Sequence, residues 1–327
     1  MKILVDAMGG DNAPNEIIKG VVEAADNVKG EIVLIGDEKI IKEQLAQYDK
    51  KDNIIIKHAS EVITNEDTPT KAIKEKKDSS MNIGFKMLHD KEGDVFISAG
   101  NTGAIMTGAL LITGRIKGVH RPALCPILPS ETGKFLMIDC GANTNCKPDY
   151  LVQFAKMANI YMTRTMGVSN PKIGLVNIGA EEGKGNDLTK ATYDLLKKTN
   201  LNFVGNVEAR DLVAGKVDIA VCDGFTGNVI LKTMEGMGVA VFNILKEQIQ
   251  QSLKSKIGAL LMKPALRGIK HKMDYSEYGG GLLLGIDGAV VKCHGTSKAK
   301  TIKNAVLQAY DFANNGVVEA IRKDIKE

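Results

Sequence analysis

The chain has no tryptophan and few aromatic residues of any kind, which argues against one class of partner. Aromatic side chains make up 5% of its 327 residues, and its formal net charge is only +4. Proteins that bind single strands stack bases on aromatic rings, and contacts to phosphate backbones depend on many positive charges. The composition therefore predicts no nucleic-acid partner.

The cysteines are also few and follow no ligand pattern. The five cysteines include no CxxC pair and no Cys/His spacing typical of zinc sites. The five histidines include no HExxH motif. We therefore expect no metal site, no disulfide framework, and reduced thiols of the kind found in the cytoplasm.

Long hydrophobic runs are missing as well. The sequence contains no stretch of about 18 apolar residues, which predicts that no helix spans a membrane. An apolar strand begins at Ile3 and Asp6 follows closely, so we expect no signal peptide and a cytoplasmic protein. Because 44% of the residues are apolar and no Pro/Ser-rich linker occurs, residues 1–327 are expected to form a single α/β domain.

The chain does contain one local pattern that returns several times: an apolar strand followed by a small, polar, glycine-bearing turn. It first occurs where Ile3–Val5 leads into Gly9 and Gly10, with Pro14 at the start of a helix. The free N–H groups of such a loop and the positive end of the helix favour an anion, although a turn without a ligand is the alternative. The same pattern returns in the turns at 99–104, 139–143, 179–186 and 223–228.

The order of these elements predicts the fold class. Apolar strands that alternate with helices are typical of a mostly parallel sheet covered on both faces. The carboxyl ends of its strands share one edge, so the five turns are expected to converge on one cleft. Asp287 and Gly288 lie between two apolar runs, which predicts a hairpin and therefore a mixed sheet.

The chemistry of the turns favours oxyanion binding. The sequence has no GxxxxGK[ST] loop, no GxGxxG after the first strand and no GxSxG elbow. It offers instead amide, hydroxyl and backbone donors, together with Lys184 between two glycines. Such donors bind an oxyanion and stabilise a developing one without a protein nucleophile, which suits acyl transfer to or from phosphate.

Five blocks of sequence carry a family resemblance. They are 5–11 (VDAMGGD), 98–104 (SAGNTGA), 139–143 (DCGAN), 222–228 (CDGFTGN) and 278–285 (YGGGLLLG). Together they resemble the PlsX family of bacterial phosphate acyltransferases, from Met1 to about Ala320. The resemblance implies transfer of a fatty acyl group from the thioester of acyl carrier protein to inorganic phosphate, giving acyl phosphate for phospholipid synthesis.

The resemblance also implies a fold and partners. The fold would be a three-layer α/β/α sandwich like that of isocitrate and isopropylmalate dehydrogenases and of phosphotransacetylase. The protein would be a homodimer without a cofactor, and a glycerol-3-phosphate acyltransferase would use its product.

The expected site residues fall into two groups. Lys184 would neutralise phosphate charge or assist the departing thiolate, and Asn143 or Asn228 would donate to the tetrahedral oxyanion. Asp139 and Asp223 would orient these donors. The alternative to a catalytic role is a helix cap for each of the two asparagines and a solvated loop side chain for Lys184. Phosphate or substrate binding is expected at Asp6, Gly9, Gly10, Asp11, Asn12, Asn101, Thr102, Gly103, Asp139, Thr226, Gly227 and His294.

His294 has a structural alternative to a catalytic role. It follows a strand and precedes a helix that Ser297 is expected to cap.

A basic segment without acidic residues runs from Leu253 to Met273. Its apolar residues recur at helical spacing, and Pro264 is expected to divide it into two short helices. We expect a helical protrusion over about 231–277 that packs on the core or a second subunit, or contacts an anionic membrane or the carrier protein at the membrane periphery. The expected contact residues are Lys254, Lys256, Ile257, Leu260, Leu261, Lys263, Arg267 and Lys270.

Two other functions stay open at this point. A nicotinamide-dependent decarboxylating dehydrogenase would need clustered arginines and a DxxxD metal site, whereas the arginines here are dispersed. A non-catalytic adaptor for carrier protein or lipid would show no phosphate-dependent loss of thioester. The sequence does not indicate the preferred length of the acyl chain.

Overall fold

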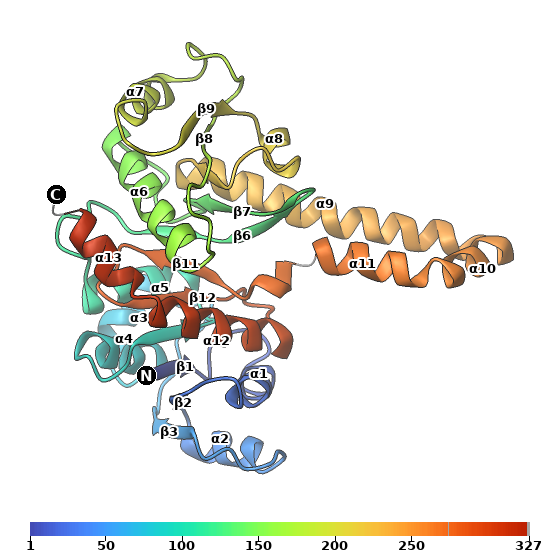
Figure 1. Cartoon of the computed structure of the whole chain (residues 1–327). Helices are drawn as coiled ribbons and strands as arrows, with labels where there is room; N and C mark the ends of the chain where they lie inside the picture. The colour runs from blue at the N-terminus through green and yellow to red at the C-terminus, as the bar shows by residue number, and fades with distance from the viewer. Residues whose placement is uncertain (274, 326–327) are drawn as a thin grey trace.

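The strands form two mostly parallel sheets, one in the lower half and one in the upper half of Figure 1. The computed structural model describes residues 1–273 and 275–325. The seven-stranded sheet has the order β3-β2-β1-β4-β12-β11-β5, and the five-stranded sheet has the order β6-β7-β10-β8-β9. The strands are β1 (Lys2–Asp6), β2 (Glu31–Gly36), β3 (Ile54–His58), β4 (Val95–Ser98), β5 (Ala123–Cys125), β6 (Ile127–Ser130), β7 (Gly133–Ile138), β8 (Ile173–Val176), β9 (Phe203–Val207), β10 (Ile219–Val221), β11 (Gly281–Leu284) and β12 (Ala289–Lys292).

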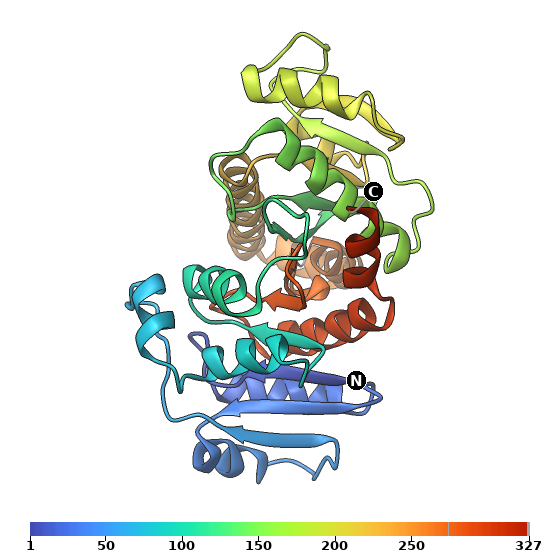
Figure 2. The same cartoon turned by 90° about the vertical axis from the view of Figure 1, so that its left-hand side faces the viewer.

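Helices cover the faces of both sheets, as the turned view in Figure 2 shows. A π-helical turn, η1 (Ala109–Thr113), continues α5, and a 3-10 turn, η2 (Tyr275–Tyr278), precedes β11. The helices are α1 (Asn15–Ala25), α2 (Glu38–Leu45), α3 (Pro69–Glu75), α4 (Ser80–His89), α5 (Thr102–Gly108), α6 (Pro148–Arg164), α7 (Asp187–Leu196), α8 (Ala209–Val213), α9 (Gly224–Gln250), α10 (Leu253–Leu261), α11 (Lys263–Met273), α12 (Ala299–Asn314) and α13 (Val317–Asp324).

The predicted α/β class with mixed, mostly parallel strands is confirmed, and so is the late hairpin, because β11 pairs antiparallel with β12. The strands divide between two sheets where one was expected. Pro126 stands between β5, at the edge of the first sheet, and β6, at the edge of the second. Proline has no N–H for a strand ladder, so it is suited to the point where the chain leaves one sheet for the next.

Side chains alternate between the two faces of each strand, and one face of each sheet contributes to a shared core. Ile3 of β1 and Leu136 of β7 belong to the same buried cluster, which extends through both sheets. Leu4 faces the other side of the first sheet, and Phe135 faces the other side of the second. The shared core fixes the two sheets against each other and holds the loops at their carboxyl ends in place.

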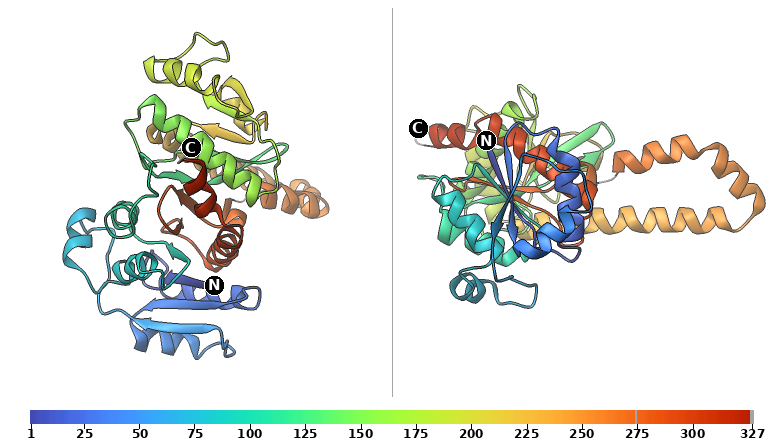
Figure 3. Two further views of the ribbon diagram at one scale, coloured as in Figure 1. Left: turned by 60° about the vertical axis from the view of Figure 1, so that its left-hand side comes forward. Right: turned by 90° about the horizontal axis from the view of Figure 1, so that it is seen from below.

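Helices α9, α10 and α11 extend away from both sheets, as the right-hand view of Figure 3 shows. The first turns of α9 pack on the second sheet through Ile230 and Met234, whereas Met237 and Ile244 further along are 58% and 59% exposed. By length and composition alone α9 could cross a membrane, because an 18-residue window of it has a mean hydropathy of 1.2. Such a helix was not predicted from the sequence, because the sequence contains no uninterrupted apolar run of that length. The break near Pro264 is confirmed, because α10 ends at Leu261 and α11 begins at Lys263.

Candidate functional site

The carboxylate of Asp6 lies beneath the glycine turn that follows β1. Its Oδ1 accepts hydrogen bonds from Ser80 Oγ at 2.6 Å and from the Met8 N–H at 3.1 Å, and its Oδ2 accepts from Ser98 Oγ at 2.7 Å. Full burial raises the pKa of Asp6 above its ordinary value, because water is excluded from the charged form. Asp6 therefore supports the loop from below in this structure, and its contact with phosphate stays a prediction.

Gly9 and Gly10 bring the loop backbone close to the neighbouring turn. A Cβ on Gly9 would overlap the Asp6 carboxylate, and it would come within 3.0 Å of the Gly100 N–H nitrogen. Gly10 has a φ of +106°, which side chains other than hydrogen rarely allow. Glycine at both positions therefore permits the close approach of this loop to the turn that follows β4.

The turn after β12 completes the same group. β1, β4 and β12 are adjacent parallel strands, so their turns share one edge of the first sheet. The Asp11 N–H donates to Gly295 O at 2.8 Å, and Asn12 Nδ2 donates to Thr296 O at 3.1 Å. The structure thus brings together residues 9–12, 99–103 and 293–296, which we call the first-sheet turns.

Asn101 acts as a helix cap within the first-sheet turns. Its Oδ1 accepts from the Ala104 N–H at 3.0 Å, and its Nδ2 donates to Thr64 O at 3.2 Å. The side chain therefore shapes the start of α5, where the backbone N–H groups of Thr102 and Gly103 belong to the positive end of the helix.

His294 is half-buried, and its hydrogen bonds define its neutral form. Its Nδ1 lies 3.3 Å from the Thr296 N–H nitrogen and accepts from it, which leaves Nε2 to carry the proton in the neutral ring. Burial, with Lys292 and Lys232 nearby, lowers the pKa of His294. The ring can thus offer one N–H donor.

The predicted cap at Ser297 is wrong. The N-cap position of α12 is Lys298 and makes no side-chain cap. The Ala299 N–H donates instead to Glu16 Oε2 at 2.7 Å, a side chain from α1 far away in sequence.

Asp139 and Asn143 form a closed pair at the end of β7. Asp139 is fully buried and accepts from the N–H groups of Leu124 at 3.0 Å and Asn143 at 2.7 Å. Asn143 Nδ2 donates to Asp139 Oδ2 at 2.8 Å and to Pro122 O at 2.7 Å. Burial raises the pKa of Asp139. Both amide hydrogens of Asn143 have partners in this structure and Asp139 has no exposed surface, so the catalytic and binding roles expected of them stay predictions.

Asp223 caps α9 directly beside that pair. Its Oδ1 accepts from the Phe225 and Thr226 N–H groups, each at 3.0 Å, and its Oδ2 accepts from Thr226 Oγ1 at 2.8 Å. A Cβ on Gly227 would overlap the carbonyl of Asp139, so glycine is required for α9 to start this close to β7. Asp223 thus caps the start of α9, and its role in orienting catalytic donors stays a prediction.

Asn228 differs from Asn143 in being available. Its side chain is exposed, lies next to Gly141, and has no hydrogen-bond partner among the described residues. It lies one turn into α9, so it is not the cap of that helix. Of the two asparagines expected to stabilise an oxyanion, Asn228 alone has an uncommitted amide in the described part of the chain. We call Asp139, Asn143, Asp223 and Asn228 the second-sheet turns.

Lys184 lies on the loop that follows β8. Because β8 pairs in parallel with β10, this loop and the start of α9 share one sheet edge. The Lys184 side chain is exposed and lies against Gly179, and its carbonyl accepts from Asn177 Nδ2 at 3.1 Å. Among the described residues the Lys184 side chain makes no hydrogen bond or ion pair with the first-sheet turns or with Asn228, and its catalytic role stays a prediction.

A narrow groove of about 90 Å³ lies between the first sheet and α9, and sequence analysis missed its charged lining. His294 and Lys292 line it from β12, and Lys232 and Glu235 line it from α9. Lys232 Nζ and Glu235 Oε2 form an ion pair at 2.7 Å. Burial lowers the pKa of Lys292. A lysine that ends a buried strand directly before Cys293 and His294 was the sequence signal that could have indicated this groove.

The described residues form no group of three or more His, Cys, Asp or Glu side chains that could hold a metal ion. All five cysteines are free, and four of them are buried. Burial raises the pKa of each of these thiols, so they are poor nucleophiles.

Comparison with known proteins identifies close relatives over the whole chain. The family model described as "Fatty acid synthesis protein" matches residues 1–320. A phosphate acyltransferase from Acetivibrio thermocellus is 54% identical over 327 residues, covering 99% of this chain and 96% of the relative. A phosphate acyltransferase from Clostridioides difficile is 48% identical over 329 residues, covering 100% of this chain and 97% of the relative.

Solved structures with a similar fold are more distant in sequence. A phosphotransacetylase from Streptococcus pyogenes matches with a TM-score of 0.65 at 15% identity, over 96% of this chain and 94% of that one. A branched-chain phosphotransacylase from Enterococcus faecalis matches with a TM-score of 0.56 at 12% identity, over 96% of this chain and 99% of that one. At such identities the likeness supports the fold alone.

Proposed function

The chain belongs to the PlsX family of phosphate acyltransferases, and from this premise we propose which of its groups transfer an acyl chain to phosphate. The protein is an enzyme of fatty acid and phospholipid synthesis. We propose that its acyl donor is the thioester of acyl carrier protein and that its product is an acyl phosphate. The convergence of three donor-rich turns at one edge of the first sheet is the observation that carries the proposal.

Inorganic phosphate binds at the first-sheet turns in this proposal. Gly9, Gly10 and the start of α5 provide backbone N–H groups, and the helix end adds partial positive charge. Asn12 and Asn101 shape the turns by bonding to neighbouring backbone carbonyls. Phosphate needs no general base near neutral pH, because one of its oxygens is already a competent nucleophile.

The chemical step is attack of a phosphate oxygen on the thioester carbon. A C–O bond forms as the C=O electrons move onto oxygen, and the oxyanion then reforms the carbonyl while the C–S bond breaks and thiolate leaves. Asn228 donates its free amide to the oxyanion, and Asp223 fixes the helix that presents it. Lys184 neutralises phosphate or thiolate charge, which requires its glycine-flanked loop to approach the first-sheet turns.

The partners follow from the same chemistry. An acyl carrier protein is acidic, and α10 and α11 present exposed Lys254, Lys263 and Arg267 without an acidic neighbour. We propose that this protrusion also touches anionic membrane, from which a glycerol-3-phosphate acyltransferase takes the product. The exposed apolar face of α9 supports a homodimer. The side chain of Lys270 lies outside the described residues.

One assay tests the function. The protein is incubated with acyl carrier protein thioester, with and without inorganic phosphate, while free thiol and acyl phosphate are measured. Phosphate-dependent release of both products is expected, and release of thiol without phosphate would indicate a thioesterase instead. In the same assay Lys184→Ala should lower the rate, whereas Lys190→Ala, an exposed lysine on α7, should not.

The other functions are not favoured. A nicotinamide-dependent dehydrogenase would change nicotinamide absorbance during turnover, and a non-catalytic adaptor would consume no thioester. Membership of the phosphate acyltransferase family supports neither.

A further inference from the structure

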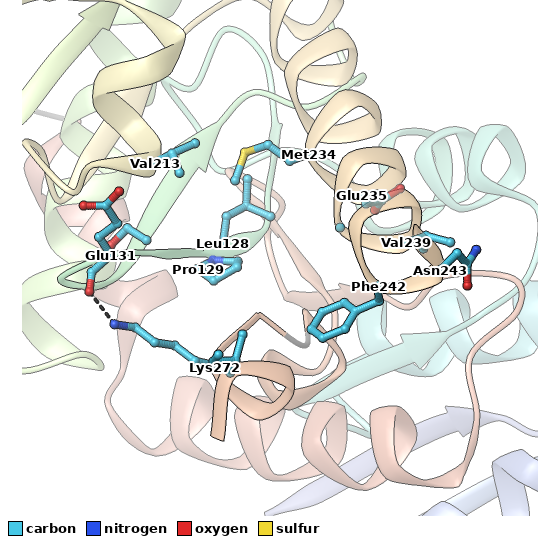
Figure 4. Close-up of a pocket in the computed structure, with 13 residues that line it drawn as sticks. Leu128, Pro129, Glu131, Val213, Met234, Glu235, Val239, Phe242, Asn243 and Lys272 are labelled. Atoms are coloured by element: carbon cyan, nitrogen blue, oxygen red, sulfur yellow. Dashed lines mark hydrogen bonds between the residues drawn. The ribbon is translucent and has the colours of Figure 1, made fainter. Parts of the chain in front are cut away.

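A large apolar cavity lies between β6 and the bases of α9 and α11. Its volume is about 510 Å³, within the range of small-molecule sites. Figure 4 shows Leu128, Met234 and Phe242 projecting into the space between the strand and the helices. The residues that line it are Leu128, Pro129, Ser130, Glu131, Val213, Met234, Glu235, Gly238, Val239, Phe242, Asn243, Ile269 and Lys272.

The cavity has polar groups on two sides: Ser130, Glu131 and Lys272 lie toward the β6–β7 turn, and Glu235 and Asn243 lie on α9. Lys272 of α11 donates to the backbone carbonyl of Glu131, as the dashed line in Figure 4 shows. This contact ties the end of α11 to the turn after β6 and closes one side of the cavity. Most of the remaining lining is aliphatic or aromatic, and Glu235 is paired with Lys232, so an apolar ligand would leave few polar groups without partners.

The cavity adjoins the charged groove described above. Leu128 and Glu235 line both spaces. The groove in turn reaches His294, whose neighbour Gly295 accepts the Asp11 N–H of the first-sheet turns. A linear ligand can therefore place a charged end near Lys292 and the first-sheet turns while its tail runs along α9 into the cavity.

We propose that this cavity holds the hydrocarbon chain of the acyl substrate and of the acyl phosphate product. This inference rests on the proposed function, which requires an acyl chain to reach the phosphate. In the adjoining groove Glu235 neutralises Lys232, so Lys292 is the cation that matches a phosphate-bearing head group, whereas the cavity itself carries mainly apolar side chains. Each methylene moved from water into such a cavity strengthens binding about fourfold.

Gly238 provides a selective way to fill the cavity. It lines the cavity from the middle of α9, and a Cβ at this position would meet no atom within 4 Å. Gly236 has the same open surroundings but does not line the cavity, because two residues along a helix point to different faces. Leucine favours a helix more than glycine does, so both Gly238→Leu and Gly236→Leu should remain folded.

The experiment compares kcat/KM of wild type and both variants for butyryl, octanoyl and palmitoyl thioesters of acyl carrier protein. Gly238→Leu should lower kcat/KM for the palmitoyl donor about tenfold or more, because the new side chain displaces methylenes, and should leave the butyryl donor nearly unchanged. Gly236→Leu should match wild type on all three donors.

Three outcomes would each contradict a different part of the argument. Phosphate-dependent transfer by wild type with no change of chain-length profile in Gly238→Leu would refute the cavity assignment alone. Absence of phosphate-dependent transfer by wild type on every donor would refute the proposed function. An equal loss on all donors, with a changed oligomeric state by sedimentation, would show that a second copy of the chain occupies the cavity and would also overturn the inference.

Discussion

Asn143 and Asn228 are the same residue type in similar turns, yet their surroundings give them different capacities. Asn143 Nδ2 donates hydrogen bonds to both Asp139 Oδ2 and Pro122 O. Asn228 has no partner among the described residues and stands beside Gly141 in an exposed position. The amide of Asn228 can donate to a transition state without breaking a hydrogen bond within the protein, whereas that of Asn143 cannot. The two asparagines should therefore differ in what they contribute to catalysis.

Asn228→Ala should therefore lower kcat about 10²- to 10³-fold with little change in the KM for phosphate, because an oxyanion donor acts in the transition state. Steady-state rates of acyl-phosphate formation measure this effect. Asn200→Ala, an exposed asparagine after α7, is the matched control and should retain wild-type rates. A kcat for Asn228→Ala within a few-fold of wild type would exclude it as the oxyanion donor.

His294 gives a prediction for stability against pH. Burial and the nearby lysines lower its pKa from the ordinary value of 6.5, so the unfolded chain binds a proton at a pH where the folded chain does not. Stability must then fall as pH drops through this region. His294→Gln removes the linkage and should lose less unfolding free energy than wild type between about pH 7 and about pH 5. Urea unfolding at both values measures the difference, and equal losses would contradict the assignment.

Residue types and turn spacing suggested that Asp139 and Asp223 bond nearby groups, and both accept hydrogen bonds from backbone N–H groups in the structure. The same features could not distinguish Asn143 from Asn228, since that depends on Pro122, a tertiary neighbour. The cap predicted at Ser297 failed for the same reason: Glu16 of α1 reaches the helix start from across the fold.

At the scale of elements, α10 packs beside α9 and α11 in the described chain and leaves its apolar residues largely exposed. It has no buried residue, and Leu260 and Leu261 are 67% and 78% exposed beside exposed lysines. Hydrophobic side chains next to basic ones are suited to the boundary between anionic head groups and acyl chains. The basic amphipathic pattern allowed the two helices and their break to be predicted, but their projection away from the sheets depends on where α9 ends.

Replacing both Leu260 and Leu261 with Glu should abolish binding to anionic vesicles, because the change removes apolar area and adds negative charge at the contact. Cosedimentation with phosphatidylglycerol vesicles measures this binding. Val204→Glu places a charge on the exposed side of β9, away from the protrusion, and should bind as wild type does. Unchanged sedimentation of the double variant would mean that the membrane contact lies elsewhere.

At the scale of the whole molecule, the alternation of strands and helices was sufficient to predict the α/β class, but not its division into two sheets. Periodicity reports which residues are buried, and buried strands of one sheet look like those of two. Two interruptions decided the division: Pro126 separates β5 from β6, and the late hairpin returns the chain to the first sheet. The groove between the first sheet and α9 follows from this arrangement, so the lysine that ends β12 could be noticed in the sequence, but its approach to Lys232 of α9 could not.

The exposed apolar face of α9 leads to a prediction about dimer formation. This face contains Met237, Val241 and Ile244, which recur at helical spacing and are each at least half exposed. Exposure of these apolar side chains to water is unfavourable, and packing against a second copy of the chain would remove it. Ile244→Glu would bury a charge without a partner in such an interface, so it should weaken dimerisation about a hundredfold or more. Sedimentation velocity across a range of concentrations measures this shift, with Ile40→Glu on α2 as the control. A dimer of unchanged stability in Ile244→Glu would place the interface on another face, since an apolar contact centred on this helix could not accept an uncompensated carboxylate.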